Sequence, residues 1–370
     1  MASSSISVFA IGDFLAQLIL YILPSRISDR VRENTSPQTV LVLRDGSTKR
    51  ANDGNNNEPR MTLFEGVFAT LLFDLALFGT SNPIINFIIR AFTTIQNSWD
   101  RPFQNETEAE SKIFEFCTRL DIRRHPWMWH RPAGEYGSLN DFFSRTYAPE
   151  YFPRLGDGRV VSPACCKIST YDDDEGLRRL LIKGCEYDVS KIGLPDDENN
   201  LLLEAYRSNR VFVGYLGPKD YHRVHSPISG KCTHCRLEGA DSNSASVKFF
   251  GGKFNLLNDN KRLVVVLEEE SSTVGGGESN GNDDVVVEVQ EPPLRVALVI
   301  VGGVGVNTIT YDKDMVGRSI GKGQEISTFR AGGSAFAMFT SKRLDIVPAL
   351  SRAAEEGICV EANVGETLAN

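Results

Sequence analysis

The sequence has no excess of positive charge. Its 40 Lys and Arg residues are outnumbered by 48 Asp and Glu residues, which gives a net charge of −8. It also has no Lys/Arg cluster interleaved with aromatic side chains, although binding to duplex nucleic acid normally depends on neutralising phosphates. We therefore expect no nucleic-acid partner, and the simplest consequence of the negative charge is solubility.

A regular cysteine framework is also lacking. The seven cysteines form an odd and irregular set, which argues against a secreted disulfide scaffold and predicts a reducing, intracellular compartment. Cys232 and Cys235 have the spacing of a metal-binding pair, but no second pair follows at a zinc-ribbon distance, and a structural zinc site normally needs four ligands. We interpret this pair as strand residues and expect no metal site, with a zinc or redox role as the lesser alternative.

The N-terminus lacks the features of a cleaved targeting signal. Its apolar segment, residues 6–23, contains Asp13 and Gln17, and no basic residue precedes Arg26. An acidic residue in the middle of a membrane span costs about 2.5 to 3.5 kcal/mol. The segment therefore predicts a surface-lying or buried helix rather than a span.

Two further segments precede the main domain. Residues 31–60 are polar and rich in asparagine, which is typical of a linker. Residues 63–92 are apolar but contain Glu65, Asp74 and the helix-stopping Asn82-Pro83, so they predict two short amphipathic helices. These helices could cap the core or face a membrane surface, and the sequence leaves both roles open.

From about Gly158 onward the pattern changes to short apolar strands separated by turns. The clearest predicted strands are Val211–Tyr215, Leu263–Leu267 and Val296–Val301. A Gly- and Asn-rich stretch at about 268–293 predicts a disordered insertion, with a possible edge strand at 285–287. The glycines at 302–305 predict a bend rather than a dinucleotide-binding loop, because the residues that follow favour a strand over a helix.

These patterns predict an α+β protein in which an N-terminal helical region caps a β-rich catalytic domain. We place a variable segment with one apolar helix and a linker at 1–60, and a helical, membrane-associating region at 61–155. The β-rich domain then covers 156–370.

Two distant motifs carry the chemistry. Ala331-Gly332-Gly333-Ser334 places a serine behind two glycines, which leave the preceding carbonyl open to attack and accept backbone angles closed to other residues. The second motif is a His-x-x-His segment at His222 and His225. Alone, Gly-Gly-Ser is usually a loop, and a histidine pair is usually a polar strand or turn.

Other motifs occur in the same order as in a known family. They are Ser138-Leu139-Asn140-Asp141-Phe142-Phe143-Ser144-Arg145, Val161-Ser162-Pro163-Ala164, Asn258-Asp259-Asn260-Lys261-Arg262 and Lys322-Gly323-Gln324-Glu325. With the first two motifs, the chain from about Phe114 onward resembles the phosphatidylserine decarboxylases, which are self-cleaving proenzymes. The resemblance implies cleavage between Gly333 and Ser334, with Ser334 converted into a pyruvoyl cofactor at the start of a separate chain 334–370.

The resemblance also implies roles for the two histidines. His225 would be the base for self-cleavage, and His222 would assist the later decarboxylation. One departure affects this scheme, because Cys165 stands where the family has an aspartate that orients the base. A thiol is a weak hydrogen-bond partner and carries little charge near neutral pH, since its usual pKa is about 8.5. Asp172, Asp173 and Asp174 lie a few residues downstream as possible substitutes.

Three functions remain open on the sequence. The first is a pyruvoyl-dependent decarboxylase that converts phosphatidylserine into phosphatidylethanolamine at a membrane surface. The second is a decarboxylase of a soluble amino acid or biosynthetic intermediate on the same scaffold, and the third is a silent, uncut homologue with a binding role. The protein is expected to be intracellular and peripheral to a membrane, with a homodimer left open.

Overall fold

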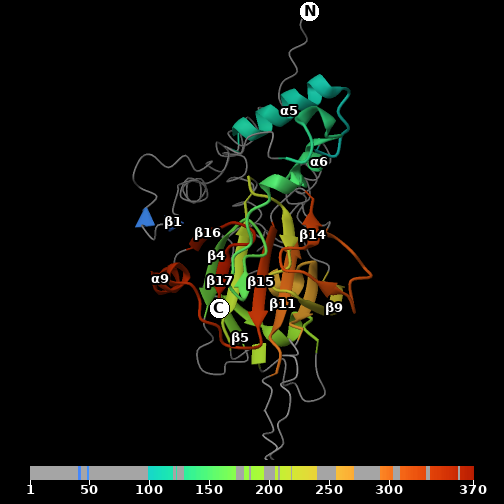
Figure 1. Ribbon diagram of the computed structural model, residues 1–370. Helices are drawn as coiled ribbons and strands as arrows, with labels where there is room; N and C mark the ends of the chain where they lie inside the picture. Colours follow the sequence, from blue (N-terminus) through green and yellow to red (C-terminus); the bar gives the residue numbers. More distant parts are fainter. Residues whose placement is uncertain are drawn as a thin grey trace, which may run out of the picture.

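The architecture comes from a computed structural model of the full chain (Figure 1). The structure describes residues 41–42, 48–49, 99–119, 122, 129–171, 179–182, 185–195, 205–206, 209–217, 219–239, 256–270, 292–302, 309–330, 334–356 and 359–370. The predicted apolar helices at 6–23 and 63–92 and the 285–287 strand lie outside these residues, whereas two short described strands, Leu41–Val42 and Thr48–Lys49, fall within the predicted linker at 31–60. The domain boundaries placed at 60 and 155 stay predictions.

The described elements are mainly strands. The strands are β1 (Leu41–Val42), β2 (Thr48–Lys49), β3 (Val160–Val161), β4 (Cys166–Tyr171), β5 (Arg179–Ile182), β6 (Cys185–Asp188), β7 (Val211–Leu216), β8 (Arg223–His225), β9 (Gly230–Glu238), β10 (Arg262–Glu268), β11 (Arg295–Gly302), β12 (Ile309–Tyr311), β13 (Ser319–Ile320), β14 (Glu325–Phe329), β15 (Ser334–Thr340), β16 (Cys359–Ala362) and β17 (Thr367–Ala369). The helices are α5 (Glu106–Arg119), α6 (Leu139–Phe143), α8 (Leu256–Asp259) and α9 (Pro348–Glu356), with short 3₁₀ turns at Ala133–Glu135, Pro149–Tyr151 and Val189–Lys191.

One large sheet organises the molecule. Its strand order is β13-β9-β10-β11-β15-β7-β4-β16-β1-β2, and its neighbours are antiparallel except for β1 and β16. A three-stranded sheet, β12-β14-β8, and the pairs β17-β3 and β5-β6 complete the described strands. The predicted strands at 211–215, 263–267 and 296–301 are confirmed as β7, β10 and β11, and the Cys232–Cys235 segment lies within β9.

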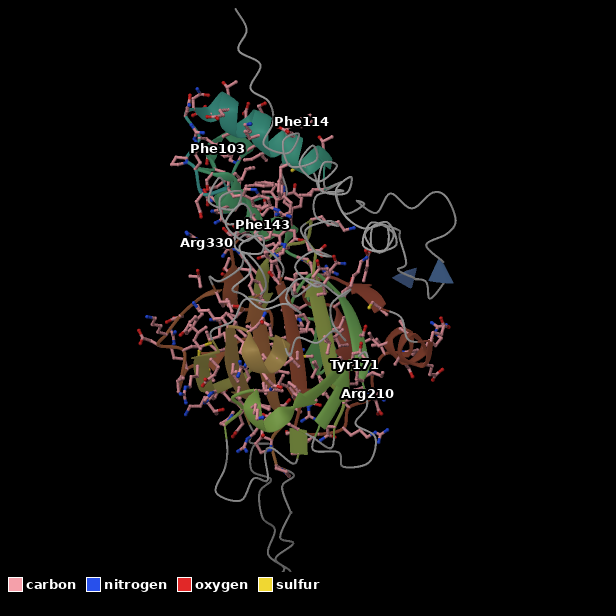
Figure 2. All side chains as sticks on the ribbon, turned by 180° about the vertical axis from the view of Figure 1, so that it is seen from behind. Phe103, Phe114, Phe143, Tyr171, Arg210 and Arg330 are labelled. Atoms are coloured by element: carbon pink, nitrogen blue, oxygen red, sulfur yellow. The ribbon has the colours of Figure 1, made fainter. Side chains whose placement is uncertain are left out.

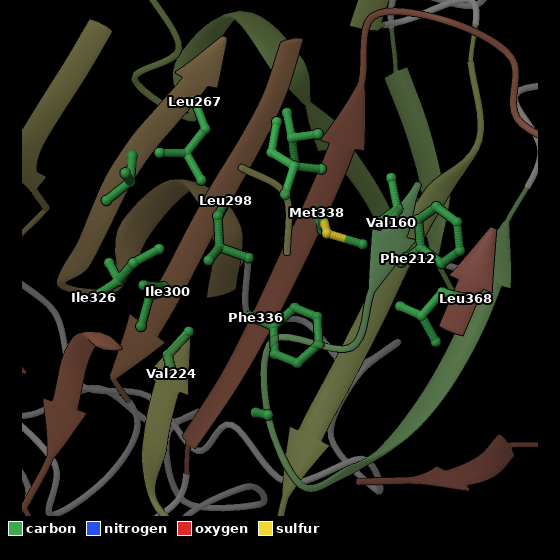
Figure 3. Packing of buried hydrophobic residues seen from close by; sticks show 14 of the residues in the cluster. Val160, Phe212, Val224, Leu267, Leu298, Ile300, Ile326, Phe336, Met338 and Leu368 are labelled. Atoms are coloured by element: carbon green, nitrogen blue, oxygen red, sulfur yellow. The ribbon is translucent and has the colours of Figure 1, made fainter. Parts of the chain in front are cut away.

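The central strands are buried on both faces. Every residue of β15 is buried, and its alternate side chains enter two different cores. Phe336 and Met338 pack in the larger core, whereas Ala335, Ala337 and Phe339 pack in the core on the opposite face. Figure 3 shows Phe336 and Met338 among aliphatic side chains contributed by β8, β11 and β14. A continuous apolar run is the expected composition of a strand covered on both sides.

A helical region packs at one end of the large sheet, as Figure 1 shows for α5 and α6. Asn105 caps α5 by accepting a hydrogen bond from the Glu108 N–H at 2.9 Å. The buried residues Ala109, Ile113 and Phe116 recur at helical spacing, so they form the face that turns toward the core. α6 is capped in the same way by Ser138, whose Oγ accepts from the Asp141 N–H at 3.1 Å.

The helical region and the sheet share an aromatic cluster. Phe142 and Phe143 of α6, together with Tyr147, pack in one cluster with Cys165 and Tyr221, which come from the β-rich part. The predicted α+β class, with a helical cap on a β-rich domain, is therefore confirmed. The cap closes over the end of the sheet at which β15 begins.

The segment after Ser334 is not composed of strands alone. β15 and β16 belong to the large sheet and β17 pairs with β3, but α9 lies between β15 and β16 and contacts β4 and β16. α9 is amphipathic, because Leu350 and Ala353 form a buried apolar face on a helix whose other side is exposed. The segment 334–370 thus contributes both strands and a helix to the β-rich domain.

Gly214 of β7 illustrates how closely the central strands fit. It pairs with Phe336 of β15, and a Cβ at position 214 would lie 2.1 Å from the Phe336 ring. Gly214→Ala is expected to lower the free energy of unfolding by about 1 to 3 kcal/mol, because the ring must leave its place in a packed core. Urea unfolding would measure the change. Gly321→Ala is the matched control, since its nearest neighbour would be Gln324 Oε1 at 3.8 Å, and equal losses in both variants would contradict the expectation.

Candidate active site

Ser334 is the first residue of β15 and is completely buried. It pairs with Gly302 of β11 on one side and with Leu216 of β7 on the other. The serine predicted to be the cofactor precursor is therefore held at the end of a central strand, next to the helical cap. Gly333, the other residue of the predicted cleavage site, lies outside the described residues.

His222 is the histidine that contacts Ser334. The His222 Nδ1 atom lies 3.3 Å from Ser334 Oγ, and its Nε2 atom lies 2.9 Å from the carbonyl oxygen of Gly217. A carbonyl oxygen only accepts hydrogen bonds, so in the neutral ring Nε2 carries the proton and Nδ1 offers a lone pair. The Ser334 hydroxyl can therefore donate to Nδ1, which is the arrangement a base needs to activate a serine.

The chain path explains why these two residues meet. Gly217 directly follows Leu216, the β7 residue that is paired with Ser334. The chain then turns back through Asp220, whose N–H donates to the Gly217 carbonyl at 2.9 Å, and reaches His222 just before β8. The turn between β7 and β8 therefore folds over the end of β15.

The surroundings keep His222 uncharged. Its ring is fully buried and stacks on Phe143, with ring centroids 3.8 Å apart, and Figure 2 shows Phe143 between the helical cap and the sheet. Burial, followed by the positive charge of Arg145, lowers the pKa of His222 to about 3. Near neutral pH the ring is consequently an acceptor on its Nδ1 side.

Arg145 is the nearby buried cation. Its guanidinium lies over the ring of Trp129 at 4.4 Å and over that of Phe142 at 5.0 Å, which are cation–π distances. One of its nitrogens donates to the carbonyls of Lys219 at 3.0 Å and Asp220 at 3.1 Å. Arg145 therefore ties the helical cap to the turn that carries His222.

His225 has different partners. Its Nδ1–H donates to the carbonyl of Gly323 at 2.8 Å, so its Nε2 accepts from the Tyr221 hydroxyl at 3.1 Å. Gly323 adopts φ +78°, a backbone conformation that favours glycine, and this turn presents its carbonyl to the ring. Burial lowers the pKa of His225. The structure thus brings His222, rather than His225, to Ser334, and the base role assigned to His225 stays a prediction.

Cys165 lies in the aromatic cluster beside these histidines. It is buried, and its Sγ lies 3.7 Å from the hydroxyl of Tyr147. The ring of Tyr147 is 4.6 Å from that of Tyr221, the partner of His225. The neighbouring Pro163 carbonyl accepts from the His225 N–H at 2.8 Å, so the Ser-Pro-Ala-Cys segment does reach the His-x-x-His segment. The three aspartates proposed as substitutes, at 172–174, lie outside the described residues.

Several residues of the site escaped the interpretation of the sequence. Phe143 and Arg145 were part of a quoted motif but received no role, and neither did Gly217, Asp220 or Tyr221. The available signal was their position, since two of them lie in the Ser138–Arg145 motif and the other three lie within or just before the His-x-x-His segment. Their roles depend on backbone carbonyls and ring stacking, which a residue pattern does not show.

Two other predictions concern metals and membranes. Cys232 is buried and Cys235 is partly buried on β9, and the part of the chain that the structure describes has no group of three or more possible metal ligands. Among the described helices, none combines the length and the apolar composition that a membrane span requires.

Comparison with known proteins identifies the family. A family model described as phosphatidylserine decarboxylase matches residues 139–370. A phosphatidylserine decarboxylase proenzyme of Clostridium perfringens is 27% identical over 274 residues, which cover 72% of this chain and 82% of the relative. Proteins of the same name from Fusobacterium nucleatum and Brevibacillus brevis are 26% and 32% identical over 175 and 111 residues.

Coverage differs among these relatives. The matched region spans 54% of the Fusobacterium protein and 39% of the Brevibacillus protein, and 45% and 30% of this chain. The family model, in contrast, covers more than half of the chain and includes Phe143, Arg145, both motif histidines and Ser334. The protein belongs to the phosphatidylserine decarboxylase family.

Proposed function

We propose that this protein is a pyruvoyl-dependent decarboxylase that cleaves itself between Gly333 and Ser334 and then converts phosphatidylserine into phosphatidylethanolamine. The observation that carries the proposal is the 3.3 Å contact between His222 Nδ1 and Ser334 Oγ. It joins the two motifs of the family, which lie more than a hundred residues apart in the sequence. The names of the relatives supply the substrate class.

Self-cleavage begins with the hydroxyl of Ser334. The Oγ atom attacks the carbonyl carbon of Gly333 while His222 Nδ1 takes the hydroxyl proton. His222 then passes this proton to the nitrogen of residue 334 as the peptide C–N bond breaks, which leaves a free amine and a chain joined through an ester. Loss of the α-proton of residue 334 then breaks the ester C–O bond and leaves dehydroalanine. Addition of water to its imine tautomer releases ammonia and leaves the pyruvoyl group.

The position of Ser334 fits this cofactor. A pyruvoyl group supplies a carbonyl that can join the substrate amine and accept the electrons left when CO2 departs. The residues around position 334 are those that a proton-transfer site requires, namely a neutral imidazole with a free lone pair and an apolar wall formed by Phe143. Once protonated, His222 can donate its proton to the carbanion that remains when CO2 departs. His222 thereby keeps the role in decarboxylation that the family resemblance implies for it.

Cleavage need not dismantle the fold. β15 is bonded along its length to β11 and β7, and its side chains are buried in both cores. The chain 334–370 also adds β16 to the same sheet and pairs β17 with β3. Ladder hydrogen bonds and apolar burial would therefore hold this chain in place after the covalent link is lost.

The helical cap offers apolar surface for a membrane. Phe114 on α5 is 74% exposed, and Tyr151 and Leu155 at the base of the cap are 37% and 40% exposed. Figure 2 shows Phe114 on the outer helix, away from the sheet. Exposed apolar side chains beside the active-site end favour a phospholipid substrate over a soluble amino acid.

Intact-mass measurement tests the first step. Freshly purified protein is expected to contain a chain 1–333 and a chain 334–370 that begins with pyruvoyl, whereas Ser334→Ala should give one uncut mass. Ser327→Ala is the matched control, because Ser327 is also buried and is expected to leave cleavage unchanged. The cut protein should release CO2 from phosphatidylserine in detergent micelles and not from free serine. A wild-type chain that stays uncut at all times would favour a silent homologue.

Histidine variants test which ring takes the proton. His222→Gln is expected to slow self-cleavage at least about 100-fold, because a positioned base contributes 10²- to 10⁴-fold to such a reaction. His225→Gln should cause a smaller loss, and His234→Gln on β9 serves as the control. The cut fraction is followed on denaturing gels after cell-free synthesis. If His222→Gln were cleaved normally and His225→Gln were not cleaved, His225 would be the base for self-cleavage.

A further inference from the structure

Asp220 and His222 are linked through one residue, Gly217. The Asp220 Oδ2 atom accepts a hydrogen bond from the Gly217 N–H at 2.7 Å, and the Gly217 carbonyl accepts from His222 Nε2–H at 2.9 Å. The Asp220 N–H also donates to that carbonyl at 2.9 Å. The carboxylate therefore fixes the turn whose carbonyl selects the proton position on His222.

Both ends of this turn are anchored. On one side, Leu216 is held in the sheet by its pairing with Ser334. On the other, the buried guanidinium of Arg145 donates to the Lys219 and Asp220 carbonyls. Within the turn, the bond from the Gly217 N–H to the Asp220 carboxylate depends on a titratable group.

We propose that Asp220 is a positioning residue for self-cleavage, and that its ionised carboxylate holds the Gly217 carbonyl against His222 so that Nδ1 stays unprotonated and aimed at Ser334. The inference rests on the function proposed above. In serine hydrolases a carboxylate bonds the imidazole directly and fixes its tautomer, and losing that charge while keeping the shape costs about 10⁴-fold in rate. Here the same control passes through a peptide carbonyl, in a chain that has Cys165 where its family has an aspartate.

The charges around Asp220 decide how it titrates. Burial raises its pKa to about 6, against the lowering effects of the Gly217 N–H, Lys219 and Lys167. Glu361 on β16 raises it further, and Cys166 on β4 is close enough to interact with it. Because the folded-state pKa is raised, the carboxylate loses its charge as the pH falls through about 6, and the Gly217 N–H then faces a weaker acceptor.

The test is the pH profile of self-cleavage. The full chain is synthesised in a cell-free system and transferred into buffers from pH 5 to pH 8, and the cut fraction is followed over time. For the wild type, the rate should rise about tenfold between pH 5 and pH 7, as the ionised fraction does for a pKa of about 6. Asp220→Asn keeps an acceptor oxygen without a charge, so its profile should be slow and flat over this range.

Two further variants separate positioning from stability. Asp220→Ala removes the acceptor and should be slower than Asp220→Asn at every pH. Asp312→Asn is the matched control, since Asp312 also accepts a backbone N–H in a turn, that of Asp314, but on the exposed β12–β13 connection. It should keep the wild-type rate and profile. Thermal unfolding in a Ser334→Ala background checks that each variant is folded.

The outcomes are distinguishable. A flat profile in Asp220→Asn with an intact profile in Asp312→Asn supports the proposal. If Asp220→Asn keeps the wild-type profile, at the wild-type rate or uniformly slowed, the carboxylate has no more than a structural role and the proposal is overturned, while self-cleavage stands. A wild-type chain that remains uncut at every pH would overturn both the proposed function and this inference.

Discussion

The site depends on the burial of β15 between β7 and β11. This strand is apolar on both faces and packs in two cores, which together fix its register. Ser334, its first residue, is therefore held as rigidly as the core residues that follow it. The same pairing sets Leu216 beside Ser334, and the turn that follows Leu216 carries His222 over the serine. A reactive hydroxyl and its acceptor are thereby positioned by ordinary sheet packing.

The helical cap determines the burial and the electrostatic surroundings of the candidate site. Phe143 stacks on His222, and Arg145 lies beside it under the rings of Trp129 and Phe142. Burial and this cation together hold the pKa of His222 to about 3, so the ring is neutral but a weak base. A weak base suits the proposed self-cleavage, which each molecule would perform once, because a slow first cleavage would still yield mature protein. The proposed decarboxylation would make use of the same apolar enclosure, which strengthens electrostatic interactions at position 334.

The surroundings of Cys165 bear on the aspartate that the family resemblance implies at this position. Cys165 is buried among tyrosines, and Tyr221 supplies the hydroxyl that bonds His225. His225 is bonded on its other side by the Gly323 carbonyl, so both of its nitrogens have partners without a carboxylate. His222 donates a hydrogen bond to the Gly217 carbonyl, and the N–H of Gly217 is in turn bonded to the Asp220 carboxylate. A chain that lacks one orienting acid can therefore still fix both rings by backbone carbonyls.

The α+β class, the central strands β7, β10 and β11, and the motif residues themselves could be predicted from the sequence, because apolar runs and motif residues are local signals. The sequence did not determine which histidine faces the serine, since His222 and His225 are three residues apart and only the pairing of Ser334 with Leu216 brings one of them to the hydroxyl. Nor did it reveal Asp220, whose effect passes through a peptide group. The histidine that faces Ser334 and the partner of Asp220 follow only from the tertiary structure. Both depend on strand register and on the direction of backbone carbonyls, which residue types alone do not specify.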